Sequence, residues 1–299
     1  MKLFYLSMLA LVFIVTSALA LSKKDLIQYV LEAKNESKTF ANLPVLSETS
    51  SFPILSAQGV IAIDLDSSVV LYEKNPDLAL LPASTTKIMT ALVAMESYPT
   101  ETVLEVKGVK VDGQKMGLYE GETISVENLL YGLLVFSAND AAVTLANNYP
   151  GGAGAFVAAM NAKASELHLD RTRFANPAGL DGVGHFSTAR DLIRLSEYAM
   201  RDPYFRQIVR TEEIAVASFD GRVVHKLKNI NELLGKVDGV VGVKTGWTEN
   251  ARENLVTYIE RDRKRLLIAL LGSQDRFGET KELIDWIFAN YQWEEVKYP

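Results

Sequence analysis

Strand-like segments lie near both ends of the folded part of this 299-residue chain, and the segments between them have the periodicity of helices. Residues 59–64 and 68–72 indicate two strands, and residues 240–244, 254–259 and 265–271 indicate three more. The last of these contains an unbroken apolar run, which is typical of a strand buried on both faces. We therefore expect an α/β domain in which a mainly antiparallel sheet joins the two ends and is covered by helices on both faces, with a helical subdomain.

The central part of the chain predicts helices from the spacing of its apolar residues. The clearest pattern follows Ser125, which is placed to cap a helix whose apolar residues recur three and four positions apart through Leu134. The other helices are expected at about residues 84–97, 138–148, 155–167 and 188–200, with a closing helix around residues 283–291.

The side-chain inventory excludes several kinds of site. The chain has no cysteine, so disulfides, thiolate metal ligands and a cysteine nucleophile are ruled out. Its histidines, His168, His185 and His225, are scattered without zinc-ligand spacing, and we expect neither a metal nor another cofactor. The net charge of −6 argues against a nucleic-acid partner, because phosphate binding needs clustered positive charge.

The first residues indicate export. Lys2 is followed by an apolar run from Leu3 to Leu21 that closes on Ala18-Leu19-Ala20, a small-x-small cleavage signature. We interpret residues 1–21 as a signal peptide or, alternatively, an uncleaved membrane anchor, since the run is nearly long enough to span a bilayer. Residues 22–52 are interpreted as a linker, 53–292 as the catalytic domain and 293–299 as a short tail.

Ser84 and Lys87 are the first candidates for chemistry. Residues three apart on a helix lie on one face, so the two side chains can meet. A serine hydroxyl is a poor nucleophile until a base takes its proton, and a lysine held neutral by burial or by a second cation can act as that base. Taken alone, however, the spacing is better explained as the solvated start of a helix.

Two further motifs lie where elements are expected to end. Ser137 and Asn139 fall between two helices, where a hydroxyl could relay a proton and an amide could orient a lysine or hold a carbonyl; simple helix capping is the alternative. Lys244-Thr245-Gly246 ends an expected strand. A cation and a hydroxyl there can bind a terminal carboxylate, and the glycine lets a substrate backbone approach; the alternative is a strand turning into a loop.

Together, the three motifs resemble the Ser-x-x-Lys, Ser-x-Asn and Lys-Thr-Gly constellation of penicillin-recognising serine enzymes. From about residue 53 to residue 291 the chain is similar to the serine-type D-Ala-D-Ala carboxypeptidases, the low-molecular-mass penicillin-binding proteins. The stretches that carry the resemblance are LLPASTTKIMTALVAME, VENLLYGLLVFSANDAAVTLA and NAKASELHLDRTRFANPAGLDGVGHFSTARDL. The third stretch differs from a class A β-lactamase, which has a deacylating glutamate motif in that interval. The resemblance implies a β-lactamase/transpeptidase-like fold.

The resemblance also implies a role for each motif residue. Ser84 would be the acylated nucleophile, Lys87 its base, and Ser137 the relay that passes the proton toward the leaving group. Substrate binding is expected from Asn139, Lys244, Thr245, Gly246 and Trp247, with the backbone N–H groups of Ser84 and Trp247 forming the oxyanion hole.

The implied activity is removal of the terminal D-alanine from peptidoglycan stem peptides ending in D-Ala-D-Ala, by way of an acyl-enzyme and without a cofactor. β-Lactam antibiotics would then be covalent inhibitors, and the protein would act in the extracytoplasmic cell envelope, with a membrane contact only at its N-terminus. The alternatives are a D,D-endopeptidase that cleaves cross-links, a β-lactamase, and a catalytically silent peptidoglycan-binding protein.

Two departures from the family pattern stand out. Where relatives usually have Ala-Gly soon after Lys-Thr-Gly, this chain has Ala251-Arg252, which puts the backbone of that turn in question. Larger relatives add a C-terminal β domain and an amphipathic membrane-binding tail, and we expect neither here.

Overall fold

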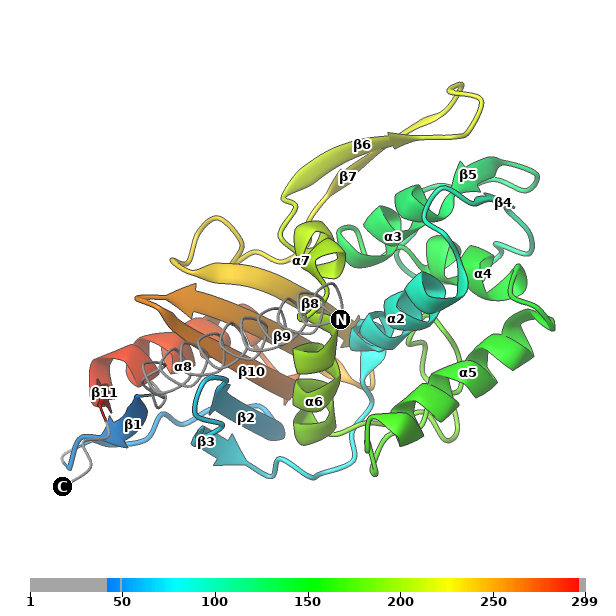
Figure 1. Cartoon of the computed structure of the whole chain (residues 1–299). Helices are drawn as coiled ribbons and strands as arrows, with labels where there is room; N and C mark the ends of the chain where they lie inside the picture. Colours follow the sequence, from blue (N-terminus) through cyan, green and yellow to red (C-terminus); the bar gives the residue numbers. More distant parts are fainter. Residues whose placement is uncertain (1–41, 49, 296–299) are drawn as a thin grey trace, which may run out of the picture. The chain divides into compact units, whose positions relative to one another are not determined.

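A five-stranded antiparallel sheet joins two strands from the first part of the folded chain to three strands from its last part (Figure 1). The computed structural model describes residues 42–48 and 50–295, and a compact unit runs from Leu43 to Glu294. The strands follow the order β3-β2-β10-β9-β8, and every neighbouring pair is antiparallel. Their bounds are β2 Gly59–Asp64, β3 Val70–Lys74, β8 Val240–Thr248, β9 Arg252–Arg261 and β10 Lys264–Ser273. The prediction of a mainly antiparallel sheet that joins the two ends is confirmed.

Helices cover the sheet and form the helical subdomain. Their bounds are η1 Ala83–Thr86, which is a 3-10 turn, α2 Lys87–Ser97, α3 Val126–Leu134, α4 Asn139–Asn147, α5 Gly152–Glu166, α6 Ala189–Ala199, α7 Pro203–Val209 and α8 Arg276–Asn290. Figure 1 shows α6 and α8 on opposite faces of the sheet. The expectation of helices on both faces is therefore also confirmed.

Strand β10 shows why the sheet needs both layers. Its side chains from Leu266 to Leu271 are all buried. Leu267 belongs to the core that contains Leu192 of α6, whereas Leu266 belongs to the core that contains Leu283 of α8. Since successive side chains of a strand point to opposite faces, an unbroken apolar run requires an apolar partner on each side.

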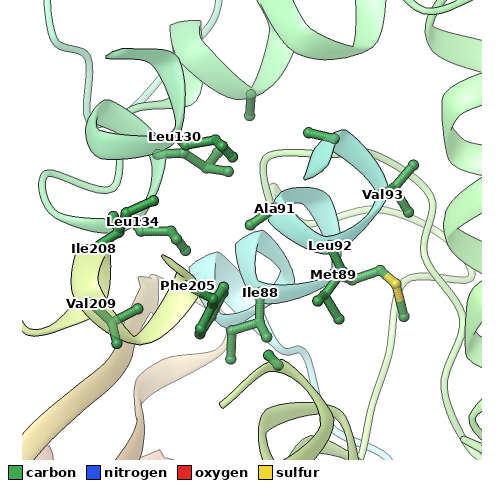
Figure 2. Close-up of a cluster of buried hydrophobic side chains, with 14 of the residues drawn as sticks. Ile88, Met89, Ala91, Leu92, Val93, Leu130, Leu134, Phe205, Ile208 and Val209 are labelled. Carbon is green, nitrogen blue, oxygen red and sulfur yellow. The ribbon is translucent and has the colours of Figure 1, made fainter. Parts of the chain in front are cut away.

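Helix α2 lies at the centre of the helical side. Its residues from Lys87 to Ala94 are all buried, as expected for a helix with apolar residues around its whole circumference. Figure 2 shows its side chains packed against Leu130 and Leu134 of α3 and against Phe205 and Ile208 of α7. The helix that begins with Lys87 is thus held on several sides by a close-packed core, which fixes the position of its first turn.

Several shorter elements were not predicted, because they contain too few residues for a clear periodic pattern. Strands β4 Val103–Glu105 and β5 Thr123–Ser125 pair with each other, and β6 Glu213–Ala217 and β7 Val224–Lys228 form a hairpin. Figure 1 shows that hairpin extending away from the sheet, beside α3. Helix α7 starts where the Asp202 carboxylate accepts hydrogen bonds from the N–H groups of Tyr204 and Phe205.

The ordered fold extends beyond the limits expected for the catalytic domain. Strand β1, Leu43–Leu46, lies in the segment interpreted as a linker and pairs with β11, Tyr291–Glu294, which reaches into the segment interpreted as a tail. The polar composition of the linker concealed this strand, whose partner lies almost 250 residues away in the sequence. No helix within residues 42–48 and 50–295 is both long and apolar enough to cross a membrane. The N-terminal run 1–21 lies outside the described residues.

Candidate active site

Lys87 and Ser84 are in direct contact at the start of the central helix. Ser84 lies in the 3-10 turn η1, Lys87 is the first residue of α2, and their Nζ and Oγ atoms are 2.9 Å apart. The Lys87 amine also lies 2.6 Å from Asn139 Oδ1 and 2.5 Å from the carbonyl oxygen of Ala178. The last two atoms can only accept hydrogen bonds, whereas the serine hydroxyl can donate or accept.

This set of partners fits a neutral amine. A neutral amine has two hydrogens and one lone pair. If its hydrogens go to Asn139 Oδ1 and the Ala178 carbonyl, the lone pair is left facing the hydroxyl of Ser84. Burial lowers the pKa of Lys87 to about 7, and the nearby Asp140 carboxylate partly opposes this shift.

Lys244 is a second buried lysine, and it lies close enough to Lys87 for their charges to interact. Its side chain is inaccessible to solvent within β8, and its Nζ donates to the carbonyl of Thr245 over 3.0 Å. Burial, together with the positive charges of Lys87 and Arg276, holds the pKa of Lys244 well below its usual range. The charge of Lys87 thus disfavours protonation of Lys244.

Ser137 and Asn139 lie where α3 ends and α4 begins. The alternative that they cap α4 is not borne out, since Ala138 occupies the cap position and no side chain makes the capping hydrogen bond. Ser137 adopts the left-handed backbone region with φ of 62°, which is uncommon for a residue other than glycine and marks a constrained position. The Asn139 amide accepts from Lys87 and donates from Nδ2 to the carbonyl of Asp112 over 2.6 Å, so both of its ends are used.

Strand β8 brings the third motif against the serine turn. The structure corrects the expectation that Lys244-Thr245-Gly246 ends a strand, because β8 continues to Thr248. A Cβ atom added at Gly246 would lie 3.0 Å from the carbonyl oxygen of Pro82 and 3.2 Å from the nitrogen of Ser84. A glycine is therefore needed for the strand to approach Ser84 this closely.

A cavity of about 540 Å³ lies where the three motifs meet. Residues of all three motifs and of the segment around Ala178 line it, together with the end of β8 and parts of three further segments. The lining residues are Ser84, Gly113, Gln114, Ser137, Asn139, Ala178, Gly179, Leu180, Ile230, Thr245, Gly246, Trp247, Thr248, Glu249 and Arg276. Lys87 and Lys244 are buried behind this surface. Trp247, which is 61% exposed, presents a large aromatic face at the cavity.

The segment that provides the Ala178 carbonyl is itself built by local hydrogen bonds. Asn176 Oδ1 accepts from the backbone N–H groups of Ala178, Gly179 and Leu180, and Thr90 Oγ1 donates to the carbonyl of Pro177. Gly179, with φ of 83°, lies so close to the carbonyl of Ala83 that no side chain would fit. The stretch carries part of the family resemblance, but nothing in its sequence marks the carbonyl of Ala178 as a hydrogen-bond partner of Lys87.

His185 has a structural place next to the site. Burial lowers its pKa to about 4, so the ring is neutral near pH 7. Its Nδ1 accepts from the N–H of Ala175 over 2.9 Å, which leaves Nε2 to donate to Thr86 Oγ1 over 2.9 Å. The ring thus links η1, the turn that contains Ser84, to the segment that contains Ala178.

Arg276 was also missed, because nothing in its local sequence distinguishes it from other residues at the start of a helix. Its Nη1 donates to the carbonyl of Gly246 over 3.0 Å, and its buried Nε has no partner among the described residues. The residue therefore brings a guanidinium group to the cavity beside β8. Within the described part of the chain, no group of three or more His, Asp or Glu side chains could hold a metal ion.

The fold and the converging motifs define a penicillin-recognising serine enzyme. A family model described as D-alanyl-D-alanine carboxypeptidase, of peptidase family S11, matches residues 47–275, and the chain belongs to this family of serine peptidases. The family acts on the bacterial cell wall, outside the cytoplasm. The family and the fold inferred from the sequence are thereby confirmed.

Individual relatives carry more than one name for related reactions. The D-alanyl-D-alanine carboxypeptidase DacB2 of Mycobacterium tuberculosis is 37% identical, over 78% of this chain and 82% of that protein. A D-alanyl-D-alanine endopeptidase of Pseudomonas aeruginosa is 35% identical, over 83% of this chain and 80% of that protein. Among solved structures, the Streptomyces K15 DD-transpeptidase has a TM-score of 0.75 at 29% identity, covering 80% of this chain and all of that one.

Proposed function

We propose that this cavity removes the terminal D-alanine from peptidoglycan stem peptides, with Ser84 as the nucleophile and Lys87 as its base. The observation that carries the proposal is the environment of the lysine amine. Two pure acceptors account for its hydrogens, and its third neighbour, at 2.9 Å, is the hydroxyl of Ser84. A base within hydrogen-bonding distance of the proton it must remove, with a pKa near 7, is suited to general base catalysis.

The reaction conserves atoms and charge through two half-reactions. Ser84 Oγ attacks the carbonyl carbon of the penultimate D-alanine while Lys87 takes the hydroxyl proton. As the C–N bond breaks, that proton passes by way of Ser137 to the leaving amine, and free D-alanine departs. Water then adds to the acyl carbonyl, gives up a proton to the same base, and releases the shortened peptide with Ser84 restored.

Polar groups of β8, η1 and α8 suit two parts of the substrate, namely its terminal carboxylate and the carbonyl that is attacked. Thr245 and the guanidinium of Arg276 line the cavity, with Lys244 behind them, and these groups suit the terminal carboxylate. The backbone N–H groups of Ser84 and Trp247 are the proposed oxyanion hole for the tetrahedral intermediate. Asn139 is proposed to act mainly by holding Lys87, because both ends of its amide already have protein partners.

The site of action follows from the substrate. We propose that residues 1–21 direct export, so that the enzyme works in the periplasm or at the outer face of the cytoplasmic membrane, where its substrate lies. β-Lactam antibiotics are proposed as covalent inhibitors that acylate the same hydroxyl.

Labelling with a fluorescent penicillin tests the proposal directly. The wild-type protein should retain the label through denaturing electrophoresis, and Ser84→Ala should not, while its thermal unfolding stays near that of the wild type because only one oxygen is removed. Loss of the nucleophile costs a factor on the order of 10⁶ in serine peptidases. Labelling that persists in Ser84→Ala would refute the assignment.

A D,D-endopeptidase is the second candidate, favoured by the similarity to the Pseudomonas protein of that name. Purified enzyme incubated with a mixture of monomeric and cross-linked muropeptides separates the two activities. Release of free D-alanine supports the carboxypeptidase, and conversion of dimers to monomers supports the endopeptidase.

A further inference from the structure

A buried pair of ionisable side chains, Glu122 and His225, lies outside the active site and has no part in the chemistry described above. Both side chains are almost completely inaccessible to solvent, and His225 Nε2 lies 2.7 Å from Glu122 Oε1. The other ring nitrogen, Nδ1, lies 3.1 Å from the carbonyl oxygen of Met116. Because a carbonyl can only accept, Nδ1 is the donor in that contact.

The carbonyl that His225 holds belongs to a segment of the chain that forms one wall of the catalytic cavity. Residues 106–122 connect β4 to β5, and the middle of this segment brings Gly113 and Gln114 to the cavity. The segment contacts the Ser137 motif directly, since the N–H of Asn139 donates to the carbonyl of Gln114 over 2.7 Å. The Asp140 carboxylate accepts from the N–H groups of Met116, Gly117 and Leu118.

The same segment orients the amide that holds the catalytic lysine. Asn139 Nδ2 donates to the carbonyl of Asp112 over 2.6 Å, and Asn139 Oδ1 accepts from Lys87 at 2.6 Å. A continuous path of hydrogen bonds and backbone therefore leads from the β7 hairpin through residues 112–116 to Lys87 and Ser84. We propose that His225, held by Glu122, is a positioning residue for the reaction, which sets the place of residues 112–116 and thereby the orientation of Asn139 and Lys87.

The burial of this pair supports a role in positioning. A buried pair of ionisable side chains contributes little net stability compared with well-packed apolar side chains, because both groups lose their hydration. The pair instead fixes positions and orientations. The Glu122 carboxylate orients the His225 ring, and Nδ1 of that ring holds the carbonyl of Met116. The inference rests on the proposed function only in taking Lys87 and Ser84 as the reacting groups.

The test compares two double variants that differ only in the side chain at position 225, which is a polar amide in one and apolar in the other. Removing His225 alone would leave the buried Glu122 carboxylate with only a long hydrogen bond from the N–H of Tyr119, at 3.3 Å, so Glu122→Leu is included in both variants. In the first variant, His225→Asn keeps an amide nitrogen at the δ position and can still donate to the Met116 carbonyl. In the second, His225→Leu has the same branching at Cγ as asparagine but no hydrogen-bond donor. The measurements are the second-order rate constant of acylation by a fluorescent penicillin and the melting temperature.

We expect the Leu variant to acylate about 10- to 100-fold more slowly than the Asn variant, as when a reacting group is displaced by part of an ångström. Both should melt within about 5 °C of each other. Equal rates in the two variants would overturn the proposal. Ser84→Ala tested alongside keeps the questions separate, because persistent labelling there refutes the proposed nucleophile and says nothing of His225.

A double-mutant cycle tests the route. The two double variants are each combined with Asn139→Ala. The acylation rate should then be the same with Asn or Leu at position 225, because the side-chain amide of Asn139, through which the effect passes, is gone. An undiminished effect in that background would show that His225 acts elsewhere.

Discussion

The two faces of the central sheet are used differently. Between the sheet and α8, side chains such as Leu266, Ile268, Leu283 and Ile287 form an apolar core. On the opposite side, the helical core surrounds buried polar groups, among them Lys87, Asn139 and Asp140. Each of these groups is matched with a partner, because an unmatched one would lower stability. One face thus contributes mainly to stability, whereas the other uses part of its packing to hold reactive groups in place.

Replacing the Lys87 amine by an apolar group should give the largest difference between the effect on catalysis and the effect on stability. Lys87→Met keeps a similar length but has no base, so we expect D-alanine release to fall by a factor on the order of 10³ to 10⁴. Stability should be unchanged or higher, because burial of an ionisable group is no longer required. Turnover assays and chemical denaturation check both outcomes, and substantial retained turnover would exclude Lys87 as the base.

The protonation of Lys87 predicts how acylation depends on pH. Only the neutral amine can accept the proton of Ser84, so the acylation rate should rise with pH and reach half its plateau near pH 7, where burial places the pKa. A stopped-flow pH profile with a chromogenic β-lactam measures this. A half-point above pH 9 would mean that the lysine is not held neutral.

The same shift has a consequence for stability. Below about pH 7 the folded protein must bury an ammonium, whereas above it the folded protein holds a neutral amine while the unfolded chain still binds the proton. Lys87 should therefore make the free energy of unfolding rise with pH between about 7 and the ordinary lysine pKa of about 10.5. This rise should be smaller in Lys87→Met, which serves as the control.

On the α8 face, a cavity should affect stability and leave catalysis alone. Leu283→Ala removes a fully buried side chain and is expected to lower the free energy of unfolding by about 2–5 kcal/mol. At a temperature where the variant remains folded, its rate of acylation by penicillin should match the wild type. A large loss of rate in the folded variant would show that the two faces are not separable.

The smallest effect is expected at Arg252, where this chain departs from the family pattern. The structure gives this residue φ of 58°, a left-handed conformation that costs other residues about 1–2 kcal/mol and glycine almost nothing. Arg252→Gly also makes the unfolded chain more flexible, which offsets part of the gain. We expect a net stabilisation of about 0.5 kcal/mol, measured by urea denaturation, with Arg252→Ala as a control that keeps the strain.

Much of the architecture could be anticipated because its signals are local. The apolar run of β10, the cap at Ser125 and the helical spacing after it are properties of a few adjacent residues, and they predicted elements that the structure contains. Strand β1 escaped because its stability comes from β11 at the other end of the domain rather than from its own composition.

The reactive residues themselves are a matter of sequence: the serine, the lysine three positions later and the two other motifs can be recognised from the order of amino acids. Their working state is a matter of tertiary structure. Whether Lys87 is neutral depends on its burial, on the carbonyl of Ala178 and on the charge of Asp140, and these come from segments far apart in the chain. The same holds for Arg276 and for the Glu122–His225 pair, because desolvation and hydrogen-bond partners exist only once distant segments have packed together.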